Sequence, residues 1–139
     1  MRENILSLLG LMRRANAIAV GEVNTGGAAK SGKAKLLLLA ADASENARHR
    51  AEGFAAGRDI PLSTLPFTKE AFASAVGLSG GSMAAVTDLG FARALLKALA
   101  EDEPERYGAA AQRMEERYAR ARANTQVRTK RIGKRRTDA

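Results

Sequence analysis

The order of apolar and polar positions along the chain changes several times between helical and strand-like spacing. Ile5, Leu8, Leu9 and Met12 recur every three or four residues, which predicts a helix over residues 2–15. Later segments show related spacing, and Ser, Thr, Asp, Pro or Gly residues suited to helix ends bound them. The predicted helices cover residues 2–15, 22–31, 44–57, 69–76 and 89–100, and a further helix begins near Pro104.

Short apolar segments between these helices predict strands. Leu36 to Leu39 form a continuous apolar run, which is typical of a central strand buried on both faces. The segment from Pro61 to Phe67 contains a second proline, which favours an edge strand. Strands are expected at 17–20, 35–40, 61–67 and 82–87. Strands that alternate with helices predict an α/β domain with helices on both faces of a small sheet.

The chain changes character after Ala100, so we divide it into a body, residues 1–100, and a basic extension, residues 101–139. The acidic segment 101–105 predicts a hinge followed by a helix start. No apolar periodicity remains from residue 124 on, and 124–139 is expected to be disordered in the free protein.

The helix predicted at the start of the extension has an apolar seam with 4-3-4-3 spacing, suited to lie on the body or on a partner. The seam consists of Tyr107, Ala111, Met114, Tyr118 and Ala121.

The composition is that of one strongly basic domain. The 139 residues are 45% hydrophobic and carry a net charge of +8, whereas aromatic residues make up only 4%. This balance favours contacts with nucleic-acid phosphates over stacking against bases. There is no cysteine, and no segment approaches the roughly 20 apolar residues that span a bilayer. We expect a cytoplasmic protein without a membrane partner.

The residues do not suggest catalysis, a metal site or a cofactor. His49 is the single histidine and lies beside Arg48 and Arg50 on a polar helix face. Residues 27–34 have the spacing of a phosphate-binding P-loop, but Ala34 stands where a magnesium-binding hydroxyl is needed, and a strand follows instead of a helix. We expect a protein that is not an enzyme.

Positive charge gathers near one glycine-opened helix start. Backbone N–H groups at the start of a helix, here Gly21 to Asn24, attract anions. Nearby lysines flank a turn, and two arginines end the first helix. Two interpretations of these residues are open. Either they contact phosphates, or the lysines only form a solvated turn and the arginines only complement the dipole of the first helix. The residues are Arg13, Arg14, Lys30, Lys33 and Lys35.

Five short motifs occur in order over about residues 3–100: LLGLMRRA (8–15), VGE (20–22), SGKAKL (31–36), DASEN (42–46) and VTDLGFA (86–92). With these motifs the chain resembles the bacterial YlxQ-type proteins of the ribosomal L-seven-Ae/L-thirty-e superfamily. The resemblance implies a three-layer αβα sandwich with a small four-stranded mixed sheet. It also implies binding to a kink-turn, a sharply bent internal loop of RNA with tandem sheared G·A pairs, and an association with ribosomal RNA or the ribosome.

In that family a Gly-x-Asn-Glu-x-x-Lys/Arg segment at a helix start contacts the guanines of these pairs. Here Gly21 matches, while Val23, Asn24 and Gly27 stand at the Asn, Glu and basic positions. Gly26 and Gly27 would let an RNA backbone approach closely. The resemblance implies RNA contacts by Gly21, Glu22, Val23, Asn24, Thr25 and Gly27, and contact with an extruded base by Leu78.

Two functions stay open. The first is a non-catalytic, ribosomal-protein-like RNA-binding protein, expected to be a monomer, whose extension adds phosphate contacts. The second is a protein-binding adaptor of the same fold that has lost specific kink-turn recognition and uses the apolar seam for a partner helix or a second copy. The phosphate contacts expected in the extension are Arg113, Arg117, Arg120, Arg128, Lys130, Arg131, Lys134, Arg135 and Arg136.

Overall fold

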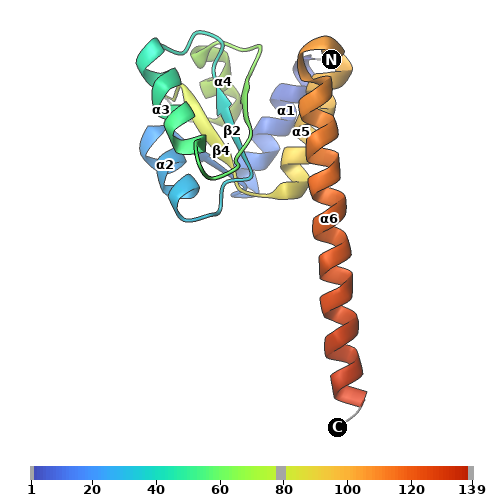
Figure 1. Ribbon diagram of the computed structural model, residues 1–139. Coiled ribbons are helices and arrows are strands. Elements are labelled where there is room, and N and C mark those ends of the chain that lie inside the picture. Colours follow the sequence, from blue (N-terminus) through green and yellow to red (C-terminus); the bar gives the residue numbers. More distant parts are fainter. Residues whose placement is uncertain (1, 78–80, 138–139) are drawn as a thin grey trace.

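A computed structural model describes residues 2–77 and 81–137, with side chains up to Thr125. It shows a mixed α/β fold in which a four-stranded sheet is enclosed by helices, and one long helix projects from the body (Figure 1). The helices are α1 (Arg2–Arg14), α2 (Glu22–Lys30), α3 (Glu45–Ala55), α4 (Lys69–Val76), α5 (Leu89–Asp102) and α6 (Pro104–Thr137). The strands are β1 (Ile18–Val20), β2 (Leu36–Leu39), β3 (Leu62–Thr64) and β4 (Met83–Val86).

The strand order is β1-β4-β2-β3, and the sheet is mixed. β2 pairs antiparallel with β4 and parallel with β3, so that Leu37 lies between Ala85 and Leu62. β4 also pairs antiparallel with β1. The predictions of a central strand within 35–40 and an edge strand within 61–67 are therefore confirmed, although the edge strand is only Leu62–Thr64.

Alternate residues of the strands face two separate helical layers. Leu36, Leu38 and Val86 pack among residues of α1, α4 and α5. Leu37 and Ala85 face the other way and pack among residues of α2 and α3. The alternation of a pleated strand thus explains why β2 is apolar at every position, and the expected αβα layering is confirmed.

Polar side chains begin three of the helices as predicted. Ser44, Thr68 and Asp88 each accept a hydrogen bond from the backbone N–H three residues later. α2 differs, because Gly21 precedes it and no side chain caps it. The side-chain caps fix where α3, α4 and α5 begin.

The extension begins differently from the prediction of a hinge. Only Glu103 separates α5 from α6, and the two helices pack side by side (Figure 1). Tyr107 and Met114 of the apolar seam are buried in the core of the body. The seam therefore lies on the body, and the first half of α6 is part of the same packed structure.

The expected disorder is also corrected for residues 124–137, since α6 continues to Thr137, whereas residues 138 and 139 lie outside the described residues. Apolar periodicity is needed for packing against another element, but not for extending a helix that already exists. Extension adds one backbone hydrogen bond per residue without a new nucleation step, and this segment is rich in Arg and Lys, which favour helix.

Candidate nucleic-acid interface

The start of α2 is an open cluster of backbone donors. Gly21 has φ 96°, a left-handed value that favours glycine, and its N–H donates to the carbonyl of Met83. The next N–H groups, from Glu22 to Asn24, precede the first intrahelical bond, which Thr25 donates to Gly21. Because no side chain caps this end, these donors are available to an acceptor outside the helix.

A groove of about 770 Å³ runs between α2 and the edge strand β1. We call it the first groove. It brings together five of the residues singled out from the sequence, which come from the end of α1, from α2 and from the turn that follows α2. They are Arg13, Val23, Asn24, Gly27 and Lys33.

Two side chains of α2 give the first groove its chemistry. Val23 is 88% exposed and presents an apolar surface. The Nδ2 of Asn24 donates to the carbonyl of Val20 at 3.0 Å, which anchors the amide at the groove. The same amide retains a second N–H and the acceptor Oδ1, a combination that can pair with the edge of a base.

The two glycines of α2 have different roles. A Cβ at Gly27 would meet nothing within 4 Å, so this part of the groove is open to a closely approaching backbone. A Cβ at Gly26 would lie 2.8 Å from the ring of Phe54. The expectation that both glycines admit RNA is therefore wrong for Gly26, which instead allows α2 to pack closely on α3.

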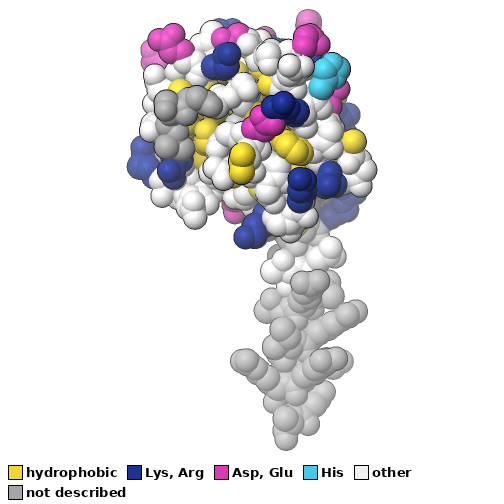
Figure 2. Space-filling model, turned by 90° about the vertical axis from the view of Figure 1, so that its left-hand side faces the viewer, with side chains coloured by type: hydrophobic (Ala, Val, Ile, Leu, Met, Phe, Trp, Pro, Cys, Tyr) yellow, Lys and Arg dark blue, Asp and Glu magenta, His cyan; other side chains and the backbone are white. Residues whose placement is uncertain are grey.

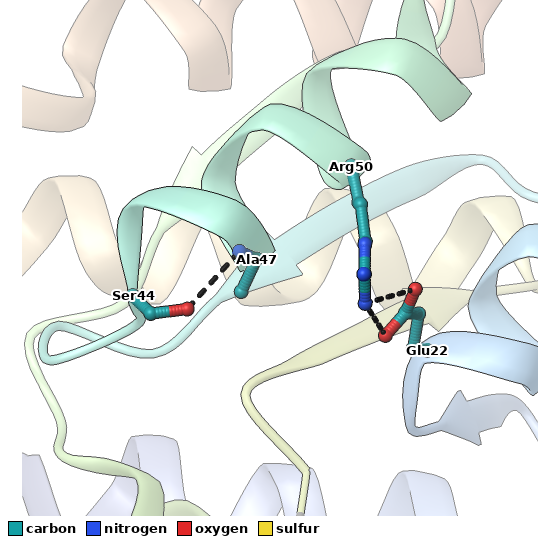
Figure 3. Close-up of polar contacts among 4 residues, drawn as sticks. All are labelled: Glu22, Ser44, Ala47 and Arg50. Atoms are coloured by element: carbon teal, nitrogen blue, oxygen red, sulfur yellow. Dashed lines mark hydrogen bonds and ion pairs between the residues drawn. The ribbon is translucent and has the colours of Figure 1, made fainter.

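Glu22 and Thr25 are also committed to the protein. Both carboxylate oxygens of Glu22 accept from Nη1 of Arg50 on α3, while Ser44 caps that helix by accepting from the N–H of Ala47 (Figure 3). Thr25 is fully buried, so the expectation that it contacts RNA is wrong. Thr25 lies on the side of α2 that faces the body. The family motif gives the spacing of residues along the helix, but not which of them face inward.

Lys30 and Lys35 lie in another groove, of about 440 Å³, which we call the second groove. Its other charged residues are Arg58 and Asp59, before β3, and Arg117, on α6. Arg58 is not among the residues singled out from the sequence, although its position just after a predicted helix end is a signal for such a residue. Its Nη1 donates to the carbonyl of Phe54 at 3.2 Å. The turn from α2 to β2 separates the two grooves.

The basic residues of both grooves share one end of the body, where α1, α2 and α3 end. On the face that carries α2 and α3, most Lys and Arg side chains lie in the lower half, toward the projecting part of α6 (Figure 2). Part of this charge complements the negative ends of the three helices. Lys33 and Lys35 lie in the turn after α2, and their positive charge is additional to the charge that complements the helix ends.

The remaining predicted contacts are distributed as follows. Arg14 is exposed at the end of α1 but lines neither groove. Leu78 lies outside the described residues. In α6, Arg113 and Arg120 are exposed, whereas Arg117 binds the body by donating to the backbone and side-chain oxygens of Asp59. The side chains of the six basic residues from Arg128 on also lie outside the description.

Within residues 2–77 and 81–137, no helix is both long and apolar enough to cross a membrane. The same part of the chain holds no group of three or more His, Asp or Glu side chains arranged to bind a metal ion.

No family model and no curated protein matches the chain. Among solved structures, it is similar to a protein with unknown function from Bacillus halodurans C, with a TM-score of 0.61 and 28% sequence identity. The match covers 66% of this chain and 91% of that protein. The similarity thus extends over nearly all of the other protein and leaves about a third of this chain unmatched.

Proposed function

We propose that the chain is a non-catalytic RNA-binding protein of the YlxQ type, whose first groove binds a kink-turn or a similarly bent internal loop. One observation carries this proposal: Val23 and the Asn24 amide from the uncapped first turn of α2, the open Gly27 and two cations lie on one groove. Backbone donors and cations suit phosphates, while an anchored amide suits a base edge. Ribosomal RNA in the cytoplasm is the partner that best fits the resemblance.

The net charge of +8 supports the same partner. Phosphate contacts supply a large share of the affinity in such complexes, and they weaken as salt rises. In the first groove, Arg13 and Lys33 provide this component. Val23 stands where the family has a polar contact, so its exposed side chain would pack against a sugar or a base face.

The test is a titration of the full chain against two RNAs near physiological salt. One contains a kink-turn, and the other has its sheared G·A pairs replaced by Watson–Crick pairs. We expect at least tenfold tighter binding of the kink-turn, which corresponds to about 1.4 kcal/mol. Equal binding of both RNAs would contradict recognition of the bent loop.

A matched variant connects this preference to the first groove. Lys33→Gln should weaken binding of the kink-turn, because it removes one phosphate contact, whereas Lys69→Gln on α4 removes the same charge from outside both grooves. If neither RNA binds, and the chain instead captures a protein, the adaptor function applies.

A further inference from the structure

The second groove is built jointly by the body and the extension. Its walls come from the end of α2, the turn before β2, the connection from α3 to β3, and α6. Arg117 closes it by donating to the carbonyl of Asp59 at 2.8 Å and to its carboxylate at 3.0 Å. The groove therefore depends on α6 being docked on the body.

The charges in this groove are strongly unbalanced. Lys30, Lys35, Arg58 and Arg117 face a single carboxylate, that of Asp59, so the formal charge of the lining is three positive. The Asp59 carboxylate is already paired with Arg117. The side chains of Lys30 and Lys35 are exposed, and their ammonium groups make no hydrogen bond or ion pair among the described residues.

The position of the second groove relates it to the first. The turn between α2 and β2 forms a wall of both, with Lys33 on one side and Lys30 and Lys35 on the other. Beyond the second groove, α6 leaves the body at the same end (Figure 1). The cations thus form one path from the first groove to the projecting helix, as the phosphates of a continuous strand would require.

We infer that the second groove binds the phosphate backbone of a base-paired RNA stem that adjoins the loop held in the first groove. The inference rests on the proposed function, since the loop must occupy the first groove for the stem to reach the second. No aromatic side chain lines this groove among the described residues, so it lacks a surface for stacking and is suited to a paired stem.

The test takes each of the two stems of the kink-turn in turn and uses a pair of RNAs that differ only in the length of that stem. For one of the two stems, the full chain should bind the long-stem RNA about tenfold more tightly than the short-stem RNA, with a steeper dependence on salt. The double variant K30Q/K35Q should bind the short-stem RNA as the unchanged chain does and lose most of the gain from the longer stem. Its salt slope on the long-stem RNA should fall by about 0.9 for each lysine removed.

The control variant K69Q/K97Q removes two exposed lysines from α4 and α5, outside both grooves, and should retain the gain. Circular dichroism and urea unfolding would establish that both variants are folded. If the affinity for RNA does not depend on the length of either stem, the inference about the second groove is wrong and the proposed function is unaffected. A chain that does not bind even the short-stem RNA would instead contradict the proposed function.

Discussion

Arg50 donates from Nη1 to both carboxylate oxygens of Glu22, at 2.8 and 2.7 Å, and so joins α3 to the first turn of α2 (Figure 3). The pair is exposed, so its contribution to stability is at most about 1 kcal/mol. We expect the pair to have a larger effect on the binding of phosphate near the first groove. A carboxylate next to the open helix start would repel phosphate, and the guanidinium neutralises it.

We therefore expect Arg50→Ala to weaken RNA binding severalfold while lowering the free energy of unfolding by less than about 1 kcal/mol. Adding Glu22→Gln should restore part of the affinity, because the unpaired charge is then gone. RNA titration and urea unfolding of the two single variants and the double variant would measure this coupling. If Glu22→Gln brings no recovery, Arg50 itself contacts the RNA.

Asn24→Ala should reduce the preference for the kink-turn over its Watson–Crick counterpart. The amide is held by the carbonyl of Val20, and a well-placed base contact discriminates by roughly 1–3 kcal/mol. Asn46→Ala changes an exposed amide on α3 and should leave the preference unchanged. A preference that survives Asn24→Ala would show that the bent shape is recognised through the backbone alone.

Thr25→Val should leave RNA affinity unchanged, because Thr25 is fully buried. Its Oγ1 has no hydrogen-bond partner among the described residues. Replacing it with a methyl group of similar size should therefore keep or raise the free energy of unfolding, by up to about 1 kcal/mol. A loss of RNA affinity without a loss of stability would show that the Thr25 hydroxyl contributes to RNA binding.

Tyr107 should make the stability of the protein depend on alkaline pH. Its hydroxyl donates to the carbonyl of Thr64, and burial raises the pKa of the phenol above its ordinary value of 10.0. The folded state therefore holds the proton more firmly than the unfolded state. This contribution is complete below about pH 10 and is lost as the pH rises through the folded-state pKa.

Tyr107→Phe removes the ionisable group and should flatten the decline in stability above about pH 10. At neutral pH it should cost about 1 kcal/mol, because the hydrogen bond to Thr64 is lost. Thermal unfolding between pH 8 and 11 would compare the two proteins, with Tyr118→Phe as the control on the same helix. An unchanged alkaline decline would contradict this role of Tyr107.

A chain that ends at Ala100 should be much less stable than one that ends at Thr125. The shorter chain loses the buried side chains of Tyr107 and Met114, each of which contributes roughly 1.5–3 kcal/mol. Urea unfolding would measure the difference. Equal stability of the two chains would show that the body folds without α6, in agreement with the boundary expected from the sequence.

Spacing and helix-end residues were sufficient to predict the layered fold. The continuous run from Leu36 to Leu39 has one main explanation, burial on both faces, and the structure confirms it. The predicted helix start at Pro104 is confirmed, whereas the hinge before it is wrong, because acidic and proline residues suit a tight helix start as well as a linker. Only tertiary packing of the seam distinguishes the two, and the sequence does not specify which surface the seam contacts.

The candidate site could be predicted only in part. The resemblance identified the helix start at Gly21, but it could not show that Thr25 faces inward or that Gly26 packs on Phe54. Those properties depend on the rotation of α2 over the sheet. The second groove depends on residues far apart in the chain, such as Arg58 and Arg117, which no local pattern connects.

The docking of α6 through its buried seam has a mechanical consequence. From the buried Met114 to Thr137, α6 extends about 35 Å at 1.5 Å per residue. A rotation of about 10° at the buried seam would displace the far end by roughly 6 Å over that length. Substitutions at the buried Tyr107 or Met114 would therefore change the direction in which α6 leaves the body, and with it the distance from the grooves to the far end of the helix.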